Sequence, residues 1–189
     1  IMNIPDEKII EWGGNRITAD SYIIPTIPRH AESDKPPWRY TISPQSLKWV
    51  SRRIRSELGI TQKKERRLII TRRSASSRSL YNEDEVIEML DRFGFEPFDL
   101  TRIPLRKQVK LFAEAEAVVA PHGAGLINTI YSKDLKIVEL FGDYVNACYY
   151  CVAGGLNFSY RYELCGDIEG ELSVNINNLK TAIKELDLQ

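Results

Sequence analysis

The stretch AVVAPHGAGLIN at residues 117–128 decides the fold of this chain. Four apolar residues come first, as in a buried strand, and PHGAG then leads into a helical pattern. This order predicts a strand, a tight turn and a helix N-terminus. Because the first N–H groups of a helix have no partner within it and the helix dipole is positive there, the turn from Gly123 to Leu126 suits an anion such as phosphate.

Strand and helix patterns alternate on both sides of this stretch. Strands are expected at 67–71, 96–100, 117–120, 136–141 and 157–164, and helices at 43–58, 82–93, 104–115, 124–131, 144–155 and 175–186. The alternation predicts a parallel sheet with helices on both faces, a Rossmann-like α/β domain over residues 43–189. Ligands of such sheets bind at the carboxyl ends of the strands.

The first 42 residues differ in character from the rest. They are rich in Pro, Trp and Gly, with short strands expected at 8–12 and 21–24, and they are typical of an inter-domain segment. The chain opens in mid-pattern at Ile1, so we expect a fragment. We find neither a signal peptide nor an apolar run of about 18 residues. We therefore expect a cytoplasmic location, with any membrane association supplied by the rest of the full-length protein.

Composition and cysteines narrow the class of protein. Lys plus Arg and Asp plus Glu both number 26, and this zero balance argues against a general nucleic-acid binder. The three cysteines, Cys148, Cys151 and Cys165, form no paired framework. Because Cys148 and Cys151 lie in an apolar run without a second such pair, we expect buried structural thiols in a reducing compartment.

An arginine-rich loop follows the strand at 67–71. Arg72, Arg73 and Arg78 present guanidinium groups that match phosphate oxygens. Because the carboxyl ends of parallel strands meet at one edge, we expect this loop near the PHGAG turn, where the two elements together would suit a diphosphate. The alternative is a solvated basic loop.

A second arginine cluster lies earlier in the chain. Arg52, Arg53 and Arg55 occupy the helix at 43–58, opposite its apolar stripe. We interpret this cluster as a solvated helix face.

Three further polar residues are expected at the ligand-bearing edge. His122 could bind a phosphate or a sugar hydroxyl, or act as acid or base near neutral pH, and its alternative is a structural histidine. Asn82 begins the helix after the arginine loop, where plain capping is the alternative. Glu139 ends an apolar strand, where a carboxylate could accept hydrogen bonds from ribose hydroxyls.

The glycine turn departs from the dinucleotide-binding fingerprint. That fingerprint needs a third Gly or Ala where this chain has Asn128, and an acidic residue about twenty positions later, whereas Glu139 comes early. A NAD site is therefore disfavoured. A NAD- or phosphosugar-binding Rossmann enzyme and a non-catalytic nucleotide- or carbohydrate-binding module stay open as alternatives.

The succession of these motifs resembles glycosyltransferase family 61, also described as capsular polysaccharide biosynthesis proteins. The resemblance rests on Arg72–Arg73 and on the segments 82–87, 94–96, 108–115, 119–128 and 138–140. It implies a GT-B architecture, with this chain as the C-terminal, donor-binding domain. It also implies inverting transfer of a sugar from a nucleotide-diphosphate sugar, often a UDP-sugar, to a glycan acceptor. The missing N-terminal domain could carry the catalytic base, so we expect this fragment to be inactive alone.

The predicted site has His122 as its catalytic residue. Its donor-binding residues are Arg72, Arg73, Arg78, Asn82, Gly123, Ala124, Gly125, Leu126, Asn128 and Glu139. The resemblance implies that helix N-termini and basic side chains stabilise the leaving diphosphate in place of a metal. No Asp-x-Asp pair or His/carboxylate cluster ends a strand, so we expect no metal and no permanently bound cofactor.

Overall fold

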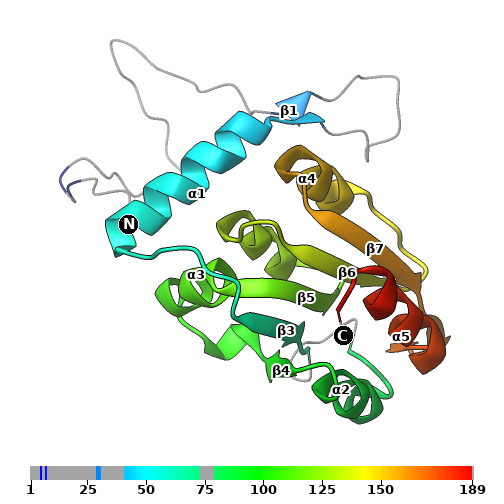
Figure 1. Ribbon diagram of the computed structural model, residues 1–189. Coiled ribbons are helices and arrows are strands. Elements are labelled where there is room, and N and C mark those ends of the chain that lie inside the picture. The colour runs from blue at the N-terminus through cyan, green and yellow to red at the C-terminus, as the bar shows by residue number, and fades with distance from the viewer. Residues whose placement is uncertain (1–4, 6, 8–28, 31–40, 73–78, 189) are drawn as a thin grey trace.

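The core of the protein is a five-stranded parallel sheet with helices on both faces (Figure 1). The structure is a computed structural model, and it describes residues 5, 7, 29–30, 41–72 and 79–188. The sheet runs in the order β4-β3-β5-β6-β7, composed of β3 (Arg66–Ile70), β4 (Phe95–Phe98), β5 (Ala115–Pro121), β6 (Lys136–Phe141) and β7 (Ser159–Leu164). The predicted Rossmann-like α/β fold is confirmed.

Helices of two layers cover the sheet. They are α1 (Pro44–Leu58), α2 (Glu83–Asp91), α3 (Leu105–Ala113), α4 (Cys148–Leu156) and α5 (Ile176–Glu185), with the 3-10 helices η2 (Leu100–Arg102) and η3 (Ala124–Tyr131). One face packs against α1, α3, η3 and α4, and the other packs against α2 and α5. Two short antiparallel pairs complete the described elements: β1 (Arg29–His30) with β2 (Thr41–Ile42), and β8 (Gly166–Ile168) with β9 (Glu171–Ser173).

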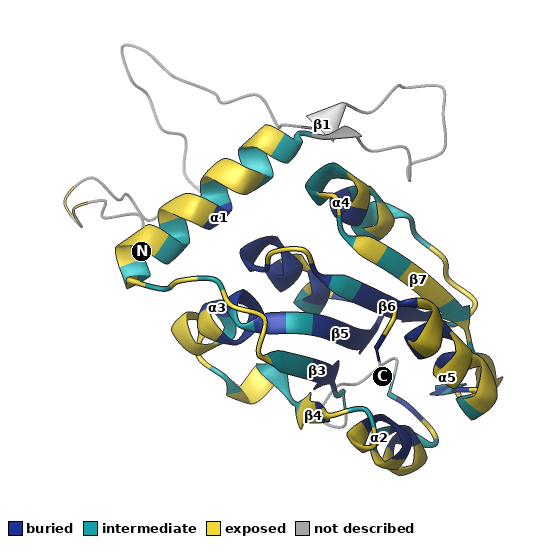
Figure 2. Ribbon diagram, in the orientation of Figure 1, coloured by how far each residue is buried: buried dark blue, intermediate teal, exposed yellow. Residues whose placement is uncertain are grey.

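The apolar run of β5 is continuous because both of its faces are buried. Ala117 and Val119 pack on the α2/α5 side, whereas Val118 and Ala120 pack on the other side. Figure 2 shows the central strands largely buried and the edge strand β7 largely exposed. Burial on both faces is therefore what makes residues 117–120 decide the fold.

The caps of α1 form where the sequence predicts them. The Ser43 hydroxyl accepts a hydrogen bond from the Ser46 N–H at 3.2 Å, and Pro44 occupies the first helical position. Gly59 ends the helix with φ 64°, a left-handed conformation that glycine adopts without strain. The apolar stripe of α1, formed by Leu47, Val50, Ile54 and Leu58, packs against the core.

Some expectations need correction or lie outside the described residues. Residues 124–131 form a 3-10 helix, in which the Asn128 and Thr129 side chains bond to the carbonyls of Gly125 and Leu126, three residues earlier, at 3.1 and 2.7 Å. The β8–β9 pair had no counterpart in the sequence analysis. The strands expected at 8–12 and 21–24 fall outside the described residues.

The strand order creates a topological switch point between β3 and β5. From β3 the chain moves outward to β4, and it then crosses to β5 on the other side of β3. Ligands of open α/β sheets bind where the connections diverge in this way, at the carboxyl ends of the strands. Ile69 pairs with Val119, so Arg72 and His122, each three residues further on, leave their strands at the same level.

Candidate active site

The centre of the candidate site is a buried histidine–carboxylate pair at the carboxyl edge of the sheet. His122 follows β5, and its Nδ1 lies 2.5 Å from Oε1 of Glu139 on β6. His122 is 7% exposed and Glu139 is 0% exposed. A carboxylate accepts hydrogen bonds, so Nδ1 of His122 donates to Oε1 of Glu139.

Tyr160 on β7 occupies the second oxygen of Glu139. Its hydroxyl donates to Oε2 at 2.6 Å. Burial, together with the hydrogen bond to Glu139 and its charge, raises the pKa of Tyr160 well above the ordinary value, so this hydroxyl keeps its proton. Each oxygen of Glu139 thus has one partner within the protein, and this carboxylate orients His122; its binding to ribose hydroxyls stays a prediction.

Aromatic rings enclose His122. Phe141 stacks on the imidazole with ring centroids 5.1 Å apart, and Tyr149 and Tyr144 lie at 5.6 and 5.9 Å. Neither these rings nor Tyr160 were among the residues expected at the site. The tyrosine-rich segment 144–150 and the alternation of tyrosines in β7 were the only signals for them. The enclosure fixes the plane of the ring and keeps its surroundings apolar.

The PHGAG turn brings the start of η3 to the same edge. The first hydrogen bond of η3 runs from the Leu126 N–H to the Gly123 carbonyl at 3.0 Å. The N–H groups of Ala124 and Gly125 therefore lie outside the helix's own bonds, as a helix start requires for anion binding. Ala124 is exposed, whereas Leu126 is 1% exposed and belongs to the core.

Gly125 has a packing reason as well as a possible ligand reason to be glycine. A Cβ there would lie 3.0 Å from Leu100 Cδ1 and 3.8 Å from Ile70 Cγ2. The absent side chain thus lets η3 lie close to the end of β3.

Asn128 acts within the protein. It is buried, and its amide donates to the Gln108 side chain at 3.0 Å and to the Gly125 carbonyl at 3.1 Å. Gln108 in turn donates to the carbonyls of Leu100 and Ile103. This network holds the turn and η2 together, so Asn128 shapes the site from behind.

The arginine loop begins beside the site. Arg72 is half-buried, and its N–H donates to the buried Glu83 carboxylate at 3.3 Å. Arg73 and Arg78 lie outside the described residues. Glu83 thus helps to fix the direction in which the chain leaves β3.

Asn82 stands at the N-cap position of α2, but its side chain makes no capping bond. The side-chain oxygen of Asn82 accepts from the Val174 N–H at 3.0 Å. Its side-chain NH₂ group donates to the Val174 carbonyl at 2.9 Å and to the Glu85 carboxylate at 3.0 Å. Asn82 therefore ties α2 to the segment after β9.

An apolar cavity of about 500 Å³ adjoins His122 on the α4 side of the sheet. Its lining includes Phe141, which stacks on His122, together with Tyr150, Tyr160 and Tyr162. Tyr150 and Tyr162 are 60% and 57% exposed, so their rings are accessible. Flat exposed rings of this kind provide stacking surfaces for the apolar face of a sugar or a base.

The cysteines are less buried than expected. Cys148, Cys151 and Cys165 are free thiols of intermediate burial. Burial, and next the Glu139 charge, raises the pKa of Cys148 to about 11. Burial and Glu163 raise the pKa of Cys165 to about 11 as well. Both thiols therefore stay protonated at neutral pH and are poor nucleophiles.

Two searches of the described residues were negative. The described part of the chain holds no group of three or more His, Cys, Asp or Glu side chains arranged for a metal ion. No helix among those residues has the length and apolar character to cross a membrane.

The fold and site together define a doubly wound α/β domain with its candidate site at the topological switch point. The family model described as Glycosyltransferase 61 matches residues 18–138. The chain belongs to this family, and membership implies glycosyltransferase activity. A comparison with curated proteins finds no match.

Proposed function

We propose that this chain binds a nucleotide-diphosphate sugar, with UDP-sugars as the first class to test, and serves its inverting transfer to a glycan acceptor in polysaccharide assembly. In this proposal residues 43–189 are the donor-binding half of a GT-B enzyme. The acceptor half and the base that deprotonates the acceptor hydroxyl belong to another part of a longer protein. No metal or permanently bound cofactor is required.

The observation that carries the proposal is the meeting of three elements at the switch point. Arg72 and His122 leave adjacent strands at the same level, and the N–H groups of Ala124 and Gly125 follow directly. A guanidinium, an imidazole and a helix start are all donors to phosphate oxygens. Their convergence suits the diphosphate of a sugar donor better than a single phosphate.

The charge balance of the transfer assigns a role to His122. The acceptor oxygen forms a bond to the anomeric carbon while the bond from that carbon to the diphosphate oxygen breaks, and the bonding electrons leave on the diphosphate. In this role the imidazole carries a proton on both ring nitrogens, and its Nδ1–H donates to the Glu139 carboxylate at 2.5 Å. His122 then donates from Nε2 to the departing diphosphate, and Arg72 supports it.

The aromatic cavity supplies the neighbouring subsite. In the proposal the transferred sugar or the acceptor sugar lies against Tyr150 and Tyr162, within reach of the diphosphate site. Stacking on exposed tyrosines orients a sugar ring without adding charge.

Binding and turnover test the proposal separately. We expect UDP or GDP to raise the melting temperature, and we expect Arg72→Ala or His122→Ala to abolish transfer by the full-length protein while the fold persists. Arg92→Ala is the matched control, because Arg92 lies at the C-terminus of α2, 71% exposed and paired with Glu88. Stabilisation by NAD alone would point to the dinucleotide enzyme. Glycan binding without any nucleotide binding would point to a non-catalytic module, and near-normal turnover in both variants would refute the site.

A further inference from the structure

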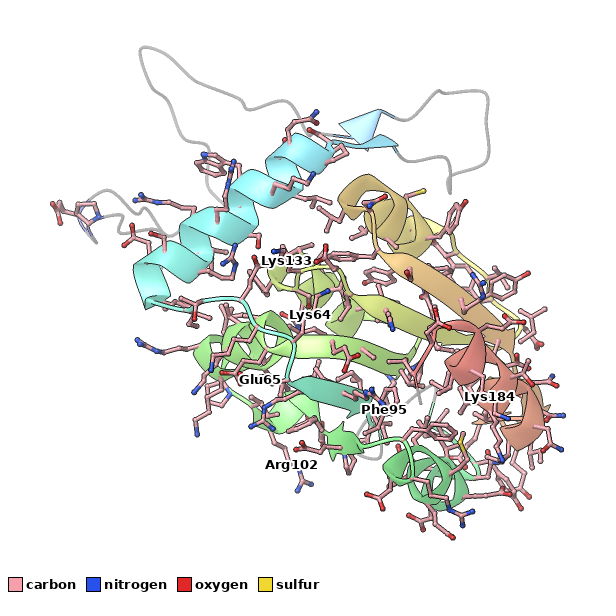
Figure 3. The ribbon with its side chains drawn as sticks, in the orientation of Figure 1. Lys64, Glu65, Phe95, Arg102, Lys133 and Lys184 are labelled. Atoms are coloured by element: carbon pink, nitrogen blue, oxygen red, sulfur yellow. The ribbon has the colours of Figure 1, made fainter. Side chains whose placement is uncertain are left out.

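A second charged pocket lies at the opposite, amino edge of the sheet. It encloses about 260 Å³ between α1 and the segments that lead into the strands. Gln62 precedes β3, Lys133 precedes β6 and Phe158 precedes β7, so the pocket lies away from the carboxyl edge that carries His122. Figure 3 shows Lys133 on the side of the sheet that α1 crosses.

Four cations line this pocket. They are Lys48, Arg52, Arg55 and Lys133. Within the described ranges, none of the four forms an ion pair, and the one acidic lining residue, Asp134, pairs with Lys64 outside the lining at 3.1 Å. The neighbouring Arg53 behaves differently, because it pairs with Glu57 at 3.0 Å.

The helix spacing concentrates this charge. Lys48, Ser51, Arg52 and Arg55 occupy positions i, i+3, i+4 and i+7 of α1, which places them along one stripe. Like charges at this spacing destabilise a helix. Burial, and next the charge of Arg52, lowers the pKa of Arg55, as expected where positive charges crowd together. An anion between them would relieve the repulsion.

The polar groups around the cations are already organised. The Ser51 hydroxyl is nearly buried and accepts from Arg55 Nε at 3.4 Å. Gln62 donates to the carbonyls of Tyr131 and Ser132 at 2.9 and 2.7 Å, so these carbonyls are engaged at the pocket wall. Arg52, Arg53 and Arg55 do not form one uniform solvated face, because Arg53 pairs with Glu57 whereas Arg52 and Arg55 line the pocket.

The geometry points to a second anion site: the pocket of Lys48, Arg52, Arg55 and Lys133 binds a phosphate group, separately from the donor diphosphate. Guanidinium and ammonium groups together match phosphate oxygens in charge and in donor number. Ile130, Leu156 and Phe158 supply an apolar wall, which suits a phosphate ester whose organic part lies against them. The phosphate could belong to a soluble ester or to an anionic lipid headgroup.

The test is an NMR titration of the ¹⁵N-labelled protein with inorganic phosphate, at low and at high NaCl. We expect saturable changes in the chemical shifts of the Ser51, Ser132 and Lys133 amides, and we expect the affinity derived from them to fall at high NaCl. In the double variant Arg52→Gln/Arg55→Gln we expect at least a tenfold loss of affinity, and in Arg53→Gln none. If the double variant folds poorly, Lys133→Gln, a change in an exposed loop, provides a second test, and its phosphate affinity should also fall.

Vesicles distinguish the two sources of phosphate. Sedimentation with phosphatidylglycerol but not with phosphatidylcholine vesicles, lost in Arg52→Gln/Arg55→Gln, assigns a lipid headgroup, whereas phosphate shifts without sedimentation assign a soluble ester. Equal loss of phosphate affinity in Arg53→Gln and the double variant would overturn the proposal, because phosphate would then respond to the positive potential of α1 as a whole and not to this pocket. Shifts confined to residues 123–125 would also overturn it, while leaving the donor site at the opposite edge intact.

Discussion

Removing the hydroxyl of Tyr160 is the sharpest test of the buried pair at the site. In Tyr160→Phe the ring stays, but Oε2 of Glu139 loses the donor that lies 2.6 Å away. Glu139 is 0% exposed, so water does not simply replace the lost group. We expect a less stable protein and a less firmly oriented His122.

The size of the effect follows from the lost bond. A hydrogen bond to a charged group contributes about 1.5–3 kcal/mol to stability. In a domain of this size 1 kcal/mol corresponds to roughly 2–4 °C in melting temperature, so the variant should melt about 3–12 °C lower. Because the pKa of Tyr160 is raised, its hydroxyl stays protonated and the deficit should persist up to pH 9.

Tyr162→Phe is the matched control for this measurement. Tyr162 lies two residues further along β7 and is 57% exposed, so water replaces its hydroxyl and the change in stability should stay within about 0.5 kcal/mol. Differential scanning calorimetry of both variants gives the comparison. If Tyr160→Phe melts with the wild type or with Tyr162→Phe, the Tyr160–Glu139 bond does not support the site.

Two further predictions concern packing and the thiols. Gly125→Ala should lower the free energy of unfolding, measured by urea denaturation, by about 1–3 kcal/mol, because the added Cβ would lie 3.0 Å from Leu100 Cδ1. Gly154→Ala in α4 is the control, because a Cβ there meets no atom within 4 Å, and it should raise the free energy of unfolding by up to about 1 kcal/mol. Equal effects of the two substitutions on the free energy of unfolding would contradict the close approach of η3. Iodoacetamide at pH 8 should alkylate Cys148 and Cys165 on the order of a hundredfold more slowly in the native than in the unfolded chain, since their pKa of about 11 keeps them protonated. The free energy of unfolding should fall as pH rises from 9 to 11, because the unfolded chain releases these thiol protons at lower pH than the folded chain does. Similar alkylation rates in the native and the unfolded chain would refute this account.

The parts of the fold that depend on local chemistry were predictable. Ser43, Pro44 and Gly59 set the ends of α1 through bonds within a few residues, and continuous apolar runs mark strands buried on both faces. The β8–β9 pair was not predictable in the same way, because its two strands have only three residues each and are largely exposed. Its position depends on Asn82, more than 80 residues earlier, which bonds to Val174.

The same distinction between local and long-range determinants applies to the candidate site. That His122 and Glu139 lie at one edge follows from strand ends alone, and the structure places them there. What Glu139 does depends on register: β6 and β7 pair Ile137 with Tyr160, which sets the Tyr160 hydroxyl against a carboxylate two residues further along β6. No single segment of the sequence contains that pairing.

The burial of Glu139 is itself informative about what the site is for. A carboxylate at 0% exposure in a buried strand loses its hydration, and well-packed apolar residues in such positions are often neutral or stabilising by comparison. Stability alone therefore gives little reason for Glu139 between Val138 and Leu140. The carboxylate instead fixes the orientation of His122, whose Nδ1 lies 2.5 Å from Oε1. His122 stands at the switch point of a chain that belongs to a glycosyltransferase family, so the desolvation of Glu139 falls where a fixed imidazole fits the proposed role in transfer.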